Sequence, residues 1–206
     1  MTEALPKTRG RPRGFDEETA LDQLTRLFWR KGYSQTSVAD MVEASGVHKP
    51  TLYRIFGSKE ELFAKVLWRY YEERMAMFSM LVDSVGPGAD GIHQFLDLLR
   101  DDVVSGTSQN GCLLVISSIE LEGTAPGFDD FGVVYRNTLR EIMGRLVGRI
   151  EADPDVLSLR TDLFVTWAMG LDVVARGSGS DPEQAVAEVD AVIDSMRSVV
   201  DLWRDR

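Results

Sequence analysis

Residues 36–56 constrain the fold of this chain most, because they predict two short helices joined by a tight turn. A hydroxyl at Thr36 or Ser37 can cap the first helix by accepting from backbone N–H groups of its first turn. Gly46 can end that helix in the left-handed conformation, and Pro50 suits the first turn of the next helix. The spacing of Val38, Met41 and Val42 gives the first helix one apolar face.

The second of these helices has one apolar and one polar face. Leu52, Ile55 and Phe56 point inward, so the outward side chains are His48, Lys49, Thr51, Tyr53 and Arg54. Such side chains can contact phosphates, guanine edges and thymine methyl groups from a DNA major groove. Two helices at a steep angle, with the second basic and polar outward, form a helix-turn-helix. An ordinary helical hairpin with a solvated face is the alternative.

The flanks of this stretch favour the first interpretation. The region around residues 15–63 resembles the DNA-binding domain of the tetracycline-repressor (TetR) family of transcriptional regulators. The matching residues are Thr36-Ser37-Val38, Ala39, Ala44-Ser45-Gly46-Val47, Thr51-Leu52-Tyr53, Phe56 and Ser58-Lys59-Glu60-Glu61-Leu62. His48 and Ile55 depart from the usual pattern, and Ile55 is expected to pack. The resemblance implies that Lys59 lies beside the DNA backbone, and that a small-molecule ligand releases a repressor from its operator.

Charge is distributed unevenly along the chain. The net charge is -10, but residues 1–56 hold nine Lys/Arg and seven Asp/Glu, whereas the remainder carries a strong acidic excess. An acidic body behind a basic DNA-binding part is compatible with DNA binding because charge is screened beyond about 10 Å. The segment Arg9-Gly10-Arg11-Pro12-Arg13 resembles the core of an AT-hook, which inserts Arg into narrow minor grooves. The alternative is a basic tail that adds only phosphate attraction. The predicted DNA-binding residues are Arg9, Arg11, Arg13, Thr36, Ser37, His48, Lys49, Thr51, Tyr53, Arg54 and Lys59.

The rest of the pattern predicts an all-α chain of about nine helices. An arm (residues 1–14) precedes a three-helix helix-turn-helix domain (15–57), and a larger helical ligand-binding and dimerisation domain (58–206) follows. Ser58 and Glu61 form a capping box at the start of a linking helix, residues 58–82, which can transmit motion between the domains. Further helices are expected over residues 89–104, 110–121, 131–151, 155–175 and 182–203.

Sequence alone does not place a ligand pocket, and the prediction is a space with aromatic walls and few polar groups. It is expected among Phe78, Phe95, Cys112, Ile116, Glu120, Tyr135 and Trp167. Cys112 is either a small buried hydrophobe or a thiol that senses oxidants or electrophiles. Glu120, at the end of an apolar run, faces either a ligand or solvent.

The last two predicted helices indicate an association surface. In the final helix, apolar residues recur at a spacing of three and four, which favours long helices packed nearly parallel. Such a face must be buried by the chain's own body, by a partner, or by both. The TetR resemblance implies that these two helices form a four-helix dimer interface. The predicted dimer residues are Leu163, Trp167, Leu171, Val174, Val189, Ile193, Met196, Val200 and Trp203.

Composition excludes several classes of protein. No apolar run reaches the 18 residues that a membrane helix needs, and a single Cys fits a reducing cytoplasm. Two His and one Cys show no metal-ligand spacing and no nucleophile–base pair, so we expect no enzyme activity, no metal and no cofactor. The expected partners are double-stranded operator DNA, an unknown small-molecule effector and a second copy of the chain. Oxidation or electrophile modification of Cys112 as the switch, and a purely helical scaffold, remain the alternatives.

Overall fold

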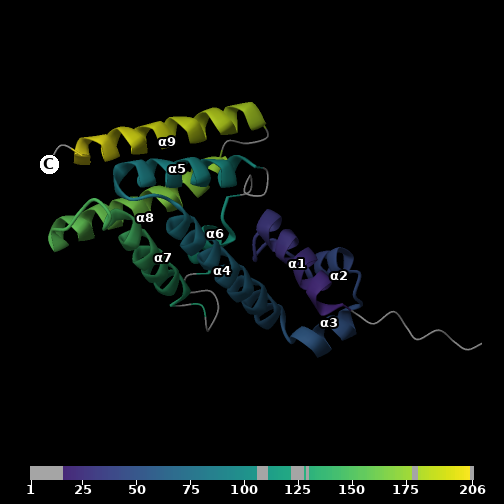
Figure 1. Ribbon diagram of the computed structural model, residues 1–206. Helices are drawn as coiled ribbons and strands as arrows, with labels where there is room; N and C mark the ends of the chain where they lie inside the picture. Colours follow the sequence, from purple (N-terminus) through teal and green to yellow (C-terminus); the bar gives the residue numbers. More distant parts are fainter. Residues whose placement is uncertain (1–15, 106–110, 122–127, 129, 178–180, 205–206) are drawn as a thin grey trace, which may run out of the picture.

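The computed structural model describes residues 16–105, 111–121, 128, 130–177 and 181–204, and within these ranges every regular element is a helix (Figure 1). The predicted all-α class is therefore confirmed. The helices are α1 (Glu17–Lys31), α2 (Val38–Ser45), α3 (Lys49–Phe56), α4 (Lys59–Ser84), α5 (Gly88–Val104), α6 (Leu113–Glu120), α7 (Phe131–Val147), α8 (Pro154–Gly177) and α9 (Pro182–Arg204).

Local signals in the sequence set the ends of the N-terminal helices. The Asp16 carboxylate accepts from Glu18 N at 3.2 Å and caps α1. Ser37 and Asp40 form a reciprocal capping box at the start of α2, so Ser37 rather than Thr36 is the cap. Gly46 ends α2 with φ of 65°, in the left-handed region that costs glycine little. These ends agree with the sequence prediction.

The N-terminal domain, α1–α3, shares its core with the first turns of α4. Phe28, Leu52 and Phe56 point inward and are at most 3% exposed. Phe63, on α4, is fully buried against this group, and its ring centroid lies 4.8 Å from that of Phe28 in an edge-on arrangement. Burying an aromatic ring on a shared core couples α4 firmly to the three helices before it.

The C-terminal domain, α4–α9, places α5 beside α9 and α7 beside both α4 and α8 (Figure 1). Arg149 closes the far end of α4, because its guanidinium donates to the carbonyl oxygens of Val82, Val85 and Gly86 at 2.5–2.8 Å. None of the described helices is long and apolar enough to cross a membrane.

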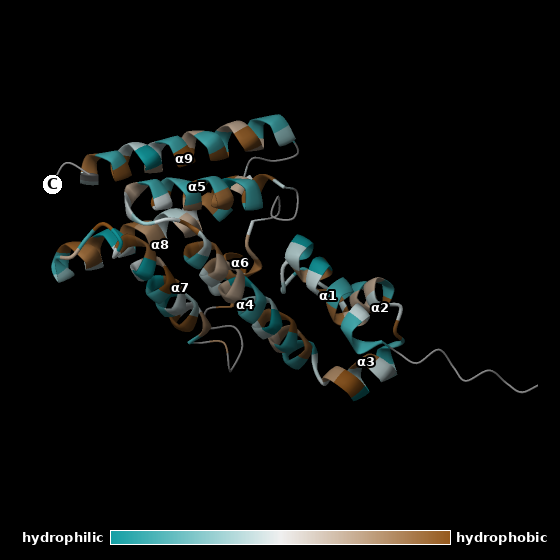
Figure 2. Cartoon of the chain, viewed as in Figure 1, coloured by the Kyte–Doolittle hydropathy of each residue, from teal (hydrophilic) through white to brown (hydrophobic). Residues whose placement is uncertain are grey.

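The apolar stripe of α9 does not face outward, which corrects part of the predicted dimer interface. Val189, Ile193, Met196 and Val200 are at most 1% exposed, and α9 packs along α5 and α8 of the same chain. Figure 2 shows the hydrophobic and hydrophilic bands that alternate along this helix. Leu171, on α8, is likewise fully buried. The stripe is covered by the protein's own body, so these five side chains are unavailable to a partner.

Two predicted helix ends also differ. α6 begins at Leu113 rather than Asn110, with Cys112 as its N-cap. α7 ends at Val147 instead of Glu151, where Gly148 N donates to Gly144 O and a turn follows.

Candidate nucleic-acid interface

The outward face of α3 carries the predicted polar side chains. His48, Lys49, Tyr53 and Arg54 are exposed, and Thr51 is half-buried. Lys49 Nζ lies 5.7 Å from the centroid of the Tyr53 ring, so the cation and the aromatic ring sit on the same patch. This face can offer cationic and hydroxyl donors to a polyanion. Leu52 and Phe56 are buried on the opposite side, and Ile55 packs against the core as expected.

The start of α2 contributes less than the sequence predicted. Ser37 is exposed, although its hydroxyl is already paired with Asp40 Oδ2 at 2.8 Å. Thr36 is only 1% exposed, and its hydroxyl donates to Gly32 O at 2.6 Å. The Thr36 side chain is therefore a structural tie to the end of α1 rather than a DNA contact, which corrects that prediction. Arg9, Arg11 and Arg13 lie outside the described residues.

Lys59, at the start of α4, is held by an aromatic ring. Its Nζ lies 4.2 Å from the centroid of Tyr33, and the Tyr33 hydroxyl donates to Glu60 Oε1 at 2.8 Å. Burial, reinforced by that hydrogen bond, raises the pKa of Tyr33 to about 12, so its hydroxyl remains a donor at neutral pH. This arrangement orients one cation at the start of α4, the helix that follows α3.

An ion pair joins the end of α1 to the first turn of α2. Lys31 Nζ lies 2.7 Å from Asp40 Oδ1. The hydrogen bond from Lys31, followed by those from Ser37, holds the pKa of Asp40 well below its usual value.

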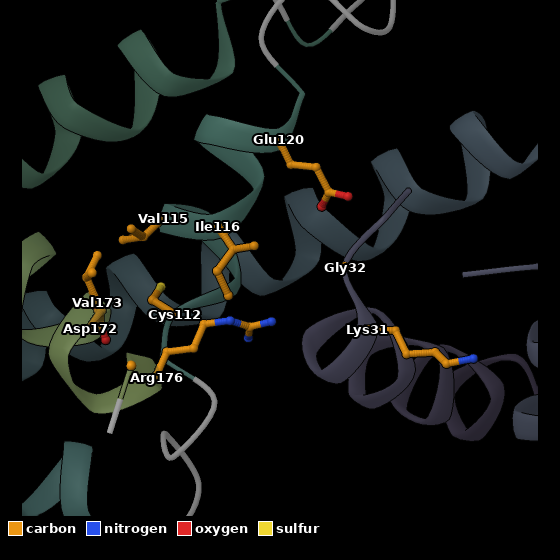
Figure 3. A pocket seen from close by; sticks show the side chains of 10 residues that line it. Lys31, Gly32, Cys112, Val115, Ile116, Glu120, Asp172, Val173 and Arg176 are labelled. Atoms are coloured by element: carbon orange, nitrogen blue, oxygen red, sulfur yellow. The ribbon is translucent and has the colours of Figure 1, made fainter. Parts of the chain in front are cut away.

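The turn between α1 and α2 is fastened to the C-terminal domain by one side chain that sequence reasoning left open. The Glu120 carboxylate accepts from Tyr33 N at 2.9 Å and Ser34 N at 2.6 Å. Figure 3 shows the Glu120 side chain directed toward Gly32, at the end of α1. Burial tends to raise the pKa of Glu120, but the hydrogen bonds from Ser34 and Tyr33 outweigh it and hold that pKa below its usual value. Glu120 thus links the two domains. The sequence had left open only a ligand contact or exposure to solvent for this residue.

Two further hydrogen bonds cross between the domains around Trp29. Its indole Nε1 donates to Gly111 O at 2.7 Å, and Arg176 donates to Trp29 O at 3.2 Å. Gly111 has φ of 68°, and a Cβ there would lie 2.5 Å from Asp172 O. Glycine at this position therefore permits both the backbone conformation and the close approach to α8.

A cavity of about 480 Å³ opens beside these contacts, between the end of α1 and helices α6 and α8 (Figure 3). Three residues of the predicted pocket, Cys112, Ile116 and Glu120, do line it. The other four do not, which corrects the predicted pocket. Phe78, Phe95 and Tyr135 are core residues with at most 2% exposure, and Trp167 stacks on Trp203 between α8 and α9.

Two buried polar groups meet at the cavity wall. Burial, together with the charge of Asp172, raises the pKa of the Cys112 thiol to about 11, so the thiol stays protonated at neutral pH. Burial also raises the pKa of Asp172 to about 7, opposed by Arg74 and assisted by Asp102. Asp172 was not singled out from the sequence, although a lone acid within the apolar run of α8 was a signal for it. The described residues contain no group of three or more metal-ligating side chains.

Comparison with known proteins places this architecture. Residues 20–66 match the model of the bacterial regulatory proteins of the tetR family. These residues therefore form a TetR-family DNA-binding domain. The repressor ComR of Escherichia coli K12 is 52% identical over 71 residues, but that match covers only 34% of either protein. The repressor BdcR of the same organism is 26% identical over 202 residues, 98% of this chain and 99% of BdcR.

A solved structure extends the similarity to most of the chain. It contains a cysteine mutant of the TetR family regulator CifR complexed with 26-bp double-strand operator DNA. The TM-score is 0.71 at 27% identity, covering 90% of this chain and 99% of CifR. Its DNA-binding domain and its fold are those of TetR-family regulators, which are non-enzymatic transcription factors.

Proposed function

We propose that this protein is a homodimeric, cytoplasmic repressor that binds a near-palindromic operator through α3 and leaves it when a small molecule binds. The observation that carries the proposal is the exposed polar face of α3, which lies within the segment matched to the TetR family. The operator complex of CifR supports the same mode of binding. On this proposal His48, Lys49, Tyr53 and Arg54 contact DNA, Thr51 and Ser37 assist, and Lys59 meets a phosphate beside them.

The domain limits of the proposal are residues 15–57 for DNA binding and 58–206 for effector binding and dimerisation. The arm with Arg9, Arg11 and Arg13 adds affinity from outside the described residues. Release from the operator requires that the effector bind the DNA-free conformation more tightly than the DNA-bound one.

The dimer is proposed to form through the side of α8 and α9 that the chain itself does not cover. Leu159, Leu163 and Leu202 are 71%, 36% and 67% exposed. Trp167 and Trp203 lie half-buried beside them, with stacked rings 6.2 Å apart, and Val174 is half-buried on α8. A twofold axis at this face would present two α3 helices to two half-sites about one helical turn apart or more.

The alternative switch, oxidation of Cys112, is not favoured by the site. The thiol is only 2% exposed and its pKa is raised, whereas a reactive cysteine needs thiolate character and access. Cys112→Ser should therefore leave any oxidant response of DNA binding unchanged. Loss of such a response in this variant would restore the thiol switch.

The test is binding to a palindromic fragment from the DNA next to the protein's own gene, followed over a series of salt concentrations. Selective binding should fall steeply with salt, because each phosphate contact releases counterions. Removal of residues 1–14 should lower the salt slope. Arg136→Ala, an exposed cation on α7, is the control for a change in net charge alone. A folded protein that binds no fragment selectively at any salt concentration would overturn the proposal.

A further inference from the structure

The cavity beside α1 has walls from both domains. The end of α1 supplies one wall, and α6 and α8 supply the others (Figure 3). Its volume of about 480 Å³ falls within the range of small-molecule sites, about 300–1,000 Å³. The apolar part of the lining is Val115, Ile116 and Val173, and the polar part is Lys31, Cys112, Glu120, Asp172 and Arg176.

One oxygen of a lining carboxylate is left without a hydrogen-bond partner among the described residues. Asp172 is 5% exposed, and its Oδ1 accepts a hydrogen bond from no described residue. Arg74, the buried cation that acts on it, directs its NH2 group to Asp102 Oδ2 at 2.6 Å instead. A buried polar atom without a partner is costly, so such an atom at a cavity wall indicates the place of a ligand donor.

The charges around Asp172 leave a place for one cation. Arg74 is paired with Asp102, so that pair is neutral and an ionised Asp172 adds one negative charge. Both cations at the cavity lining are engaged elsewhere, because Lys31 pairs with Asp40 and Arg176 donates to Trp29 O. The titratable groups that line this site or interact with it come from every helix around it. They are Lys31 on α1, Tyr70 and Arg74 on α4, Asp102 on α5, Cys112 at the N-cap of α6, Glu120 at the end of α6, Tyr135 on α7 and Arg176 on α8.

We infer that this cavity is the effector site and that it takes a small organic amine, whose ammonium group pairs with Asp172 while its apolar part contacts Ile116 and Val173. The effector role rests on the proposed repressor function. The binding site itself is inferred from the cavity and from the carboxylate oxygen that has no partner among the described residues. A charge-assisted hydrogen bond in a buried setting is among the stronger polar contacts available to a small ligand.

Occupation of this cavity would bear directly on the position of the DNA-binding helices. Gly32 lines it at the end of α1, and the Glu120 carboxylate that fastens the next turn is part of the same wall. A ligand that fits only one separation of the two walls selects one orientation of the N-terminal domain. The amine therefore shifts the protein towards a conformation with lower affinity for its operator.

The experiment uses a matched pair of probes, benzylamine and benzyl alcohol, which differ mainly in the charge of the donor. Binding to the full chain is measured by calorimetry at about pH 8, where Asp172 is ionised and the amine is protonated. Benzylamine should bind with one site per chain, and benzyl alcohol about tenfold or more weakly. Asp172→Asn should weaken the amine about ten- to hundredfold. Asp155→Asn, an exposed acid at the start of the same helix, should leave amine binding unchanged.

Two additional arms separate a local from a general effect. Ile116→Phe, which narrows the cavity without touching its charge, should weaken both probes. Between about pH 6 and pH 8 the affinity of wild type for the amine should rise about tenfold as Asp172 ionises, and this rise should vanish in Asp172→Asn. Equal affinity of amine and alcohol, amine binding that survives Asp172→Asn, or no amine binding at millimolar concentrations would overturn the inference.

Release of operator DNA by the same amine is measured in parallel. Half-release should follow the calorimetric affinity in wild type and move to higher concentration in Asp172→Asn. Amine binding without release would overturn the effector role of the site. Amine binding with no operator binding in any variant would overturn the proposed function while leaving the ligand site intact.

Discussion

Helices α3 and α9 were both predicted as interaction surfaces, but only α3 exposes the predicted residues. The polar face of α3 is exposed, with His48, Lys49, Tyr53 and Arg54 accessible. The apolar stripe of α9 is buried against α5 and α8 of its own chain, so Ile193 and Met196 are 1% exposed. A polar face can stay in contact with water, whereas an apolar face must be buried. The spacing of the apolar residues does not predict whether the same chain or a partner buries that face.

The largest effect is expected from Ile193→Ala, which tests whether the α9 stripe is buried within the protomer. If the α9 stripe is internal, this change should cost about 2–5 kcal/mol of unfolding free energy, because it leaves a cavity in the protomer. Urea denaturation of the monomeric and dimeric protein measures it. Val192→Ala, at a half-buried neighbouring position, should cost clearly less. A loss of dimer with no loss of protomer stability would return the stripe to an intermolecular interface.

Asp172 gives a second contrast with α3, because α8 buries this acidic side chain whereas α3 exposes its charged side chains. Its folded pKa of about 7 lies above the unfolded value of 3.8. Below about pH 4 both states are protonated; as pH rises towards 7 the unfolded chain ionises first, so the native state loses stability. The penalty reaches at most about 4 kcal/mol above pH 7.

Asp172→Asn should therefore be more stable than wild type by an amount that grows between about pH 4 and pH 7 and then levels off. Thermal melts over a pH series measure this difference. Asp155→Asn should show no such pH-dependent gain. A constant difference across the whole range would mean that Asp172 is ionised normally in the folded protein.

On α3, Tyr53→Ala should weaken operator binding by about 1–3 kcal/mol, roughly 5- to 150-fold, with little change in stability because Tyr53 is 38% exposed. Tyr53→Phe separates the hydroxyl from the ring. Lys49→Gln should lower the salt slope by about one. The measurement is fluorescence anisotropy with labelled operator. Operator binding as tight as that of wild type in all three variants would contradict a DNA interface on α3.

The smallest effect is expected on the uncovered face of α8 and α9. Leu202→Ser removes a side chain that is 67% exposed in the protomer, so its unfolding free energy should hardly change. Dimerisation should weaken by about 1 kcal/mol, the scale of a contributing interface residue. Sedimentation over a dilution series measures the dimer constant. Ser198→Ala, also exposed on α9, serves as control.

Much of the fold could be predicted because local rules determined it. Asp16, Ser37, Gly46 and the Ser58–Glu61 box mark helix ends through capping chemistry, which needs no knowledge of distant residues. The outward set of α3 followed from periodicity within eight residues. These parts depend on neighbours in sequence, and the structure confirms them.

The cavity and the contacts between the domains could not be predicted in the same way. Glu120 meets a turn that precedes it by 86 and 87 residues, and Arg176 meets Trp29 across 147 residues. Thr36 illustrates the limit at short range, because its hydroxyl was expected to meet DNA but donates to Gly32 O. Which polar atom is used internally depends on packing that spacing does not encode.

The contact of Glu120 with the turn after α1 has a consequence for genetics. Two of its donors, Tyr33 N and Ser34 N, belong to the backbone, so ordinary side-chain substitutions at 33 and 34 leave these two hydrogen bonds in place. Only proline, which lacks an N–H, would remove either of these two backbone donors. Mutations that uncouple the two domains should consequently accumulate at position 120 and be rare at the positions it holds. Substitutions that break this link are therefore expected in the C-terminal domain, although the link holds a turn of the N-terminal domain in place.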